Sequence, residues 1–125
     1  MIHHVSIGVR NLAAARRFYD SALKPLGYKV LAEGERYLGY GEKGADFWVM
    51  ATERPVPADE KSGLHICLAA PSRAAVDGFH AGALNSGGRD NGKPGLRPDY
   101  GDTYYAGFVV DPDGYRIEAY TAAPK

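Results

Sequence analysis

The chain repeats itself at an offset of 61 residues, and this feature limits its possible folds more than any other. Aligned on His4 and His65, residues 4–27 (HVSIGVRNLAAARRFYDSALKPLG) and 65–88 (HICLAAPSRAAVDGFHAGALNSGG) share seven identities in 24 ungapped positions. One identical pair, Phe18 and Phe79, lies at the same point of two helix-like patterns. We therefore expect a fold built twice from one supersecondary unit.

Each copy reads as a short strand, a capping residue and an amphipathic helix, followed by further strands. Asn11 and Ser72 are the expected helix N-caps, with apolar residues recurring at helical spacing after each. A turn at DPDG joins the last two strands, and YLGY at 37–40 resembles YAGF at 105–108. The strand-like segments are 28–35, 36–41, 46–52, 103–110 and 115–120. The sequence predicts one α+β domain over 1–125, made of two βαβββ modules at about 1–55 and 62–122.

The overall charge does not favour nucleic acid or an anionic membrane as a partner, because 15 basic and 15 acidic residues cancel. No apolar run approaches the roughly 20 residues of a membrane helix, and the pattern of a signal peptide is missing. The single cysteine, Cys67, is compatible with a reducing compartment. We expect a cytoplasmic protein whose partner is a small molecule or another protein chain.

Alternation along the strands places the histidines of the repeat on one face. Val5, Ile7 and Val9 would pack under a helix, which leaves His4 on the opposite, open face and gives His3 a structural role. The same argument puts His65 and Cys67 on the open face of the second module. In the last strand Ile117 and Ala119 would face the helix, so Glu118 looks into the same space, and its counterpart in the first module is Trp48.

Two imidazoles and a carboxylate on one open face form a ligand set that suits divalent iron, manganese, nickel or zinc. A single strand histidine is more often a hydrogen-bonded structural residue, so the prediction depends on the coincidence of repeat position, face and chemistry. We predict that His4, His65 and Glu118 bind a metal and that Glu118 is also the catalytic carboxylate.

The segments HHVSIGVRNLAAARRFYDSALKPLGY, GLHICLAA and FVVDPDGYRIEAY resemble the vicinal oxygen chelate superfamily, which includes glyoxalase I, fosfomycin-resistance enzymes, extradiol dioxygenases and bleomycin-resistance proteins. The resemblance implies paired βαβββ modules whose sheets curl into an open half-barrel around a divalent metal. The family's first-strand histidine, second-module histidine and final carboxylate match His4, His65 and Glu118. It also implies a homodimer, because many members take half of each site from a partner chain.

The sequence departs from glyoxalase I at Trp48, where that enzyme carries a fourth ligand, since an indole nitrogen is only a hydrogen-bond donor. The three-ligand set resembles the fosfomycin-resistance thiol transferases and the extradiol dioxygenases, which leaves a lyase, dioxygenase or transferase activity on a small oxygen-bearing substrate. The alternative is a metal-free binding protein of the bleomycin-resistance type, which the large aromatic side chains favour.

Residues 87–105 (GGRDNGKPGLRPDYGDTYY) are expected to form a long loop that covers the site or is merely solvated. As a lid, Arg97 would meet an anionic substrate group, and Tyr100, Tyr104 and Tyr105 would supply aromatic walls. Trp48 and Cys67 are further candidates for substrate binding. Alternation allows only one of Tyr104 and Tyr105 to face the site. His80, in the second helix, is expected at the surface.

Overall fold

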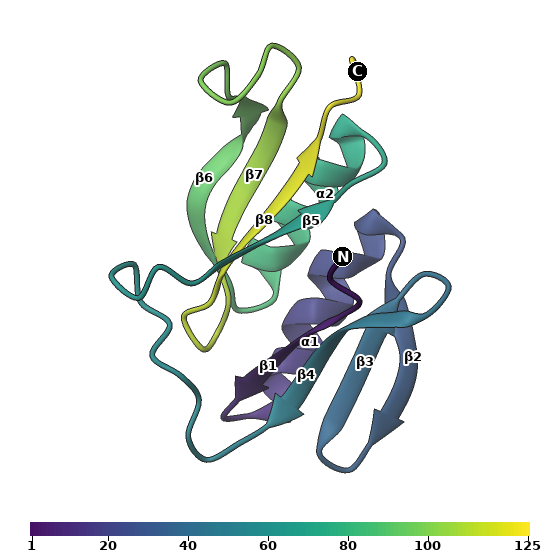
Figure 1. Cartoon of the computed structure of the whole chain (residues 1–125), viewed down its shortest axis with the longest axis vertical. Coiled ribbons are helices and arrows are strands. Elements are labelled where there is room, and N and C mark those ends of the chain that lie inside the picture. The colour runs from purple at the N-terminus through teal and green to yellow at the C-terminus, as the bar shows by residue number, and fades with distance from the viewer.

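The computed structural model describes residues 1–125 and contains the two expected βαβββ modules, so the predicted α+β fold class is confirmed (Figure 1). The first module consists of β1 (Val5–Val9), α1 (Leu12–Leu23), the 3-10 turn η1 (Lys24–Leu26), β2 (Lys29–Gly34), β3 (Tyr37–Gly41) and β4 (Ala45–Ala51). The second consists of β5 (His65–Ala69), α2 (Arg73–Asn85), β6 (Arg89–Leu96), β7 (Tyr105–Val110) and β8 (Arg116–Thr121).

The two modules form separate four-stranded mixed sheets with the same topology. The strand orders are β1-β4-β3-β2 and β5-β8-β7-β6, with one parallel and two antiparallel pairings in each. In each module the helix connects the first strand to the antiparallel part of the sheet. By this order, strands β1 and β5 are both edge strands of their sheets.

Local sequence signals fix the ends of the elements. The side chain of Asn11 accepts a hydrogen bond from the Ala14 amide at 3.0 Å, and that of Ser72 accepts one from the Ala75 amide at 3.1 Å. Both predicted N-caps are thus present. After η1 the chain turns at Gly27 with φ of +89°, a left-handed conformation that glycine adopts without a steric penalty.

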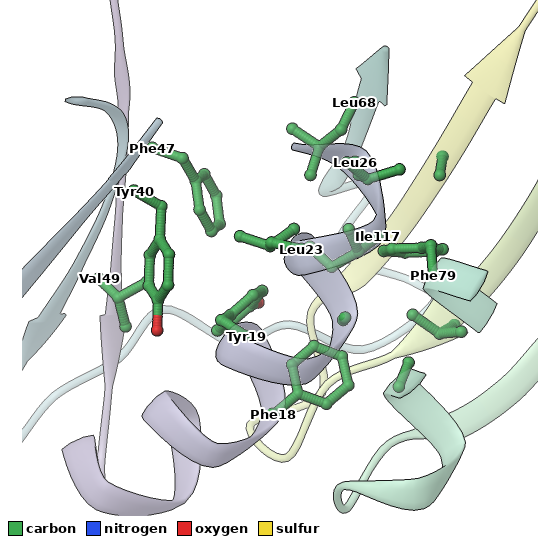
Figure 2. Packing of buried hydrophobic residues seen from close by; sticks show 14 of the residues in the cluster. Phe18, Tyr19, Leu23, Leu26, Tyr40, Phe47, Val49, Leu68, Phe79 and Ile117 are labelled. Atoms are coloured by element: carbon green, nitrogen blue, oxygen red, sulfur yellow. The ribbon is translucent and has the colours of Figure 1, made fainter. Parts of the chain in front are cut away.

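The helices α1 and α2 pack against each other between the sheets, and one core runs through both modules. Figure 2 shows Leu23 on α1 between Phe47 of the first sheet and Ile117 of the second. Phe18 and Phe79, the identical pair of the repeat, are both fully buried in this core. Because the helices occupy one face of each sheet, the opposite faces remain open for a site.

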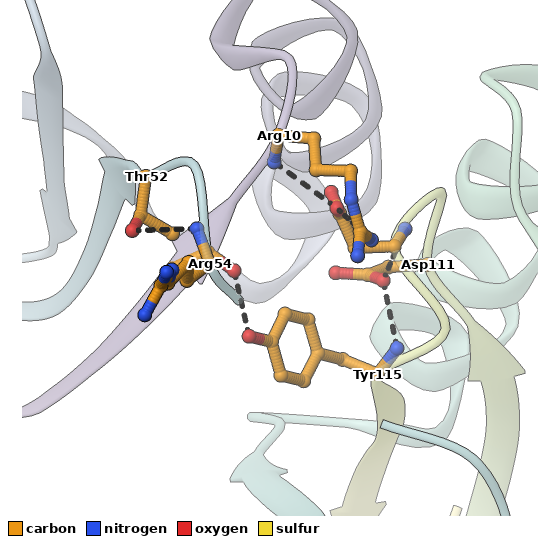
Figure 3. A network of polar contacts seen from close by, with 7 residues as sticks. Arg10, Thr52, Arg54, Asp111 and Tyr115 are labelled. Atoms are coloured by element: carbon orange, nitrogen blue, oxygen red, sulfur yellow. Dashed lines mark hydrogen bonds and ion pairs between the residues drawn. The ribbon is translucent and has the colours of Figure 1, made fainter. Parts of the chain in front are cut away.

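A second set of contacts between the modules is polar. The Tyr19 hydroxyl donates to the buried carboxylate of Asp111, which also accepts from the amides of Asp113 and Tyr115. Tyr115 in turn donates to the carbonyl of Gly8 on β1 at 2.6 Å, and Figure 3 shows it reaching across from the second module. The DPDG turn that carries Asp111 therefore helps to hold the modules side by side.

Two expectations about the second module are wrong. Strand β6 occupies Arg89–Leu96, inside the segment expected to be a loop, and leaves only residues 97–104 without regular structure before β7. His80 is buried, and its Nε2 lies 2.8 Å from Oδ1 of Asp90 on β6. The carboxylate supplies the polar partner that a buried imidazole needs.

None of the helices is long and apolar enough to cross a membrane.

Candidate functional site

The open face of the second sheet gathers the polar and aromatic groups that the alternation pattern selected. Glu118 on β8 lies beside Cys67 on β5 and beside Phe108 on β7, because these residues are direct partners in the strand register. Their helix-facing neighbours, Ile117 and Ala119, are buried in the core. The burial of these two neighbours places the Glu118 carboxylate on the face opposite the helices.

His65 and Glu118 are brought together on this face. Nε2 of His65 lies 3.0 Å from Oε1 of Glu118. The Glu118 residue is only 3% exposed, whereas the side chain of His65 is 40% exposed. The His65 ring also stacks on Phe108, with centroids 6.2 Å apart and planes at 24°. The pair therefore combines a buried carboxylate with a solvent-accessible imidazole.

The other carboxylate oxygen of Glu118 is held by Tyr104, which donates its hydroxyl to Oε2 at 2.5 Å. Burial raises the pKa of the Tyr104 phenol, and the hydrogen bond to Glu118 raises it further. Burial, followed by the negative charge of Glu118, raises the pKa of the neighbouring Cys67 thiol to about 12. At neutral pH both groups are protonated, so the structure argues against Cys67 as a reactive thiolate.

His4 does not complete a three-ligand cluster with His65 and Glu118. It precedes β1, is exposed, and its Nδ1 lies 2.8 Å from Nδ1 of His3. His4 and His65 do line one pocket of about 450 Å³ between the starts of β1 and β5, but Glu118 is not part of its lining. No group of three or more His, Cys, Asp or Glu side chains in the chain is placed to hold a metal ion.

Arg97 and Tyr100 line a second pocket, of about 360 Å³, next to Phe108. The Arg97 guanidinium lies over the Phe108 ring, 5.2 Å from its centroid, and donates to the Lys93 carbonyl at 2.6 Å. The Tyr100 ring packs edge-on against Tyr104. Each of the two predicted residues is thus one side chain away from the His65–Glu118 pair, Arg97 through Phe108 and Tyr100 through Tyr104.

The expected role of Tyr105 is not met. Its hydroxyl donates to Asp77 on α2 at 2.6 Å, and Arg73 of the same helix lies over its ring. Tyr105 is therefore on the helix side of the sheet, and its neighbour Tyr104 is the residue that reaches the site. The sequence alone left open which of these two tyrosines faces the site.

In the first module the open face carries a large aromatic side chain. Trp48 is half-buried, is the register partner of Ser6 and Gly39, and packs against Tyr37 with ring centroids 6.0 Å apart. A Cβ on Gly39 would come within 2.8 Å of the indole, so a glycine there lets the tryptophan lie flat on the sheet. This face offers an aromatic wall in place of a carboxylate.

The fold, with its two repeated modules and an open face bearing a His–Glu pair, is that of the glyoxalase-like proteins. A model of the Glyoxalase/Bleomycin resistance protein/Dioxygenase superfamily matches residues 1–119, and the chain belongs to this superfamily.

Individual proteins resemble it along nearly the whole chain. A glyoxalase/bleomycin resistance protein from Albidiferax ferrireducens T118 has 30% sequence identity and a TM-score of 0.78, covering 94% of both chains. The uncharacterized protein YqjT of Bacillus subtilis strain 168 is 28% identical, covering 94% of this chain and 95% of its own. A glyoxalase-related enzyme from Fulvimarina pelagi shares the fold, with a TM-score of 0.71 at 18% identity over 96% of this chain and 86% of its own.

Proposed function

We propose that the protein is a metal-dependent enzyme that acts on a small oxygen-bearing substrate at the open face of the second sheet. The observation that carries the proposal is the 3.0 Å separation of His65 Nε2 and Glu118 Oε1 on that face. Membership of a superfamily whose description includes glyoxalases and dioxygenases supports an enzymatic role. The reaction type is a lyase, dioxygenase or transferase step, as the donor set alone does not distinguish among them.

The His65–Glu118 pair fits a divalent cation as two adjacent ligands. Two donors that each bind a metal at about 2.1 Å lie about 3.0 to 3.4 Å apart when they are neighbours in an octahedral or tetrahedral shell. The nitrogen and oxygen of the pair already lie at this spacing. A divalent iron, manganese, nickel or zinc ion held by these two residues would supply Lewis-acid chemistry toward a substrate oxygen.

The third ligand in this proposal is His4 of the partner subunit in a homodimer. Within one chain His4 belongs to the other module, and no third donor joins His65 and Glu118. A two-fold dimer that places the first module of one copy over the second module of the other creates two equivalent sites. The aromatic wall of Trp48 and Tyr37 would then lie opposite the His65–Glu118 pair.

The residues around the pair favour an anionic substrate with an apolar part. Arg97 provides positive charge at the pocket next to Phe108, and Tyr100 provides aromatic surface there. These residues would thus bind and orient the substrate. Glu118, as a ligand of the metal, would keep the metal in position in the site.

Metal analysis of the protein purified without chelator tests the proposal. We expect about one divalent ion per chain in the wild type, on the basis of one His–His–Glu site per chain, and a loss of that ion in His65→Ala. His80→Ala is a matched control, because His80 pairs with Asp90 away from the site. Equal and negligible metal in the wild type and His65→Ala would sink the proposal.

A second candidate function is ligand binding without metal, and a specific observation favours it. The buried Glu118 carboxylate already has a partner at each oxygen, His65 at Oε1 and Tyr104 at Oε2. A thermal-shift screen with aromatic carboxylates, beginning with benzoate, separates the two functions. Stabilisation that survives a chelator favours the binding protein, and stabilisation that requires added metal favours the enzyme.

A further inference from the structure

We propose that Tyr104 is a positioning residue that holds the Glu118 carboxylate so that only Oε1 is presented as a ligand. This inference rests on the metal site proposed above. It assigns a role to a side chain that touches neither His4 nor the substrate pocket lined by Arg97. It concerns how the ligand is held and not which groups bind the metal.

The two oxygens of Glu118 have different partners. The Tyr104 hydroxyl donates to Oε2, while Oε1 faces Nε2 of His65. Because Glu118 is 3% exposed, little water competes for either oxygen. A carboxylate with one oxygen engaged by a fixed donor is directed to bind a metal through the other.

Tyr104 is itself held by two further tyrosines. Its ring lies 4.2 Å, centroid to centroid, from that of Tyr120, at an angle of 32°, and 5.2 Å from that of Tyr100. Tyr120 is on β8, two residues after Glu118 and on the same face of the sheet. The strand that carries the ligand thus also supports the phenol that orients it.

Removing such an outer hydrogen bond has a known cost in metal sites. Partners that orient a ligating side chain typically change metal affinity about 10- to 100-fold when they are mutated. Without the Tyr104 hydroxyl, the Glu118 carboxylate is free to rotate about its terminal torsion and to bind through both oxygens. The geometry therefore predicts weaker binding and an altered coordination shell, with the ligands themselves unchanged.

The experiment compares Tyr104→Phe with Tyr105→Phe in the full-length protein. Each variant deletes one phenol hydroxyl that donates to a carboxylate, but the Tyr105 bond goes to Asp77 on the helix side. The affinity for zinc is measured by competition with a chromophoric chelator, and the cobalt-substituted proteins are compared by visible absorption. We expect about 10- to 100-fold weaker zinc binding and a changed cobalt spectrum for Tyr104→Phe, and wild-type behaviour for Tyr105→Phe.

The outcomes separate this inference from the proposed function. A wild type without measurable zinc affinity overturns the metal site itself. A wild type that binds zinc and a Tyr104→Phe variant that binds it equally, with the same cobalt spectrum, overturn the role of Tyr104 alone. If Tyr104→Phe does not fold, Tyr120→Leu serves instead, because it removes the ring that supports Tyr104. A reduced affinity in that variant supports the inference, and an unchanged one contradicts it.

Discussion

Trp48 and Glu118 occupy the same position in the two modules. Trp48 on β4 is the register partner of Ser6 on β1, and Glu118 on β8 is the partner of Cys67 on β5. Ser6 and Cys67 are themselves related by the 61-residue repeat. One module therefore presents a carboxylate where the other presents an indole, whose nitrogen only donates hydrogen bonds and does not bind a metal.

Replacing Trp48 should therefore separate ligand binding from metal binding. In Trp48→Ala we expect the affinity for benzoate to fall about tenfold, the loss of one aromatic contact, with the metal content unchanged. Trp48→Phe, which keeps a ring on the wall, should retain most of the affinity. Calorimetry and metal analysis on the same samples check this, and a parallel loss of metal in Trp48→Ala would contradict it.

The fold and the chosen face were predictable from the sequence because they depend on local periodicity. Alternation in β1, β5 and β8 separated helix-facing positions from those on the opposite face, and the caps at Asn11 and Ser72 marked where the helices begin. The carboxylate of Glu118 and the imidazole of His65 were placed on one face by the same rule. Their 3.0 Å contact follows from strand pairing, which the sequence only implied through the repeat.

The errors arose where the local pattern is irregular. Strand β6 contains two register shifts, around Gly92, and its glycine, proline and asparagine content is typical of a loop. The similarity of YLGY to YAGF is one residue out of step with the structure, in which Gly39 pairs with Trp48 and Phe108 pairs with Glu118. A slip of one residue reverses the face of every side chain in a strand, so such short matches do not place a site residue.

Mixing two inactive variants tests whether each site is shared between subunits. If His65 and Glu118 of one chain bind with His4 of the partner subunit, a heterodimer of His4→Ala and His65→Ala contains one intact site. After refolding an equal mixture, about one quarter of the wild-type metal capacity should return, because about half of the dimers are mixed and each has one good site of two. Metal analysis before and after mixing checks this. No recovery in mixtures shown to contain heterodimers would place the site within a single chain or remove it.

Arg97 should determine the preference for an anionic ligand. We expect Arg97→Gln to weaken benzoate binding about 10- to 100-fold, the range for losing a hydrogen bond to a charged group, and to leave zinc affinity unchanged. Lys93→Gln is the matched control, since Arg97 bonds the backbone carbonyl of Lys93 and not its side chain, and the variant removes the same charge from the same segment. Titration at two ionic strengths checks the result. Equal losses in the two variants would mean that only the general charge of the segment matters.

The buried carboxylate at the junction of the modules should make stability depend on pH. Burial raises the pKa of Asp111 from 3.8 to about 6, against the opposing effect of its hydrogen bonds. The folded state then holds the Asp111 proton more tightly than the unfolded state. Protonation of Asp111 therefore adds to the free energy of unfolding below about pH 4, and this stabilisation is lost as the pH rises through about 6.

In Asp111→Asn this loss is absent, since the amide does not ionise. Relative to Asp111→Asn, the wild type should therefore lose about 2 to 3 kcal/mol of unfolding free energy between pH 4 and pH 7. This is the equivalent of a pKa change of about two. Urea unfolding at several pH values measures that difference, and subtraction cancels groups common to both proteins, such as the His80–Asp90 pair. A difference that stays constant across this range would show that the Asp111 carboxylate titrates in the folded protein as it does in the unfolded chain.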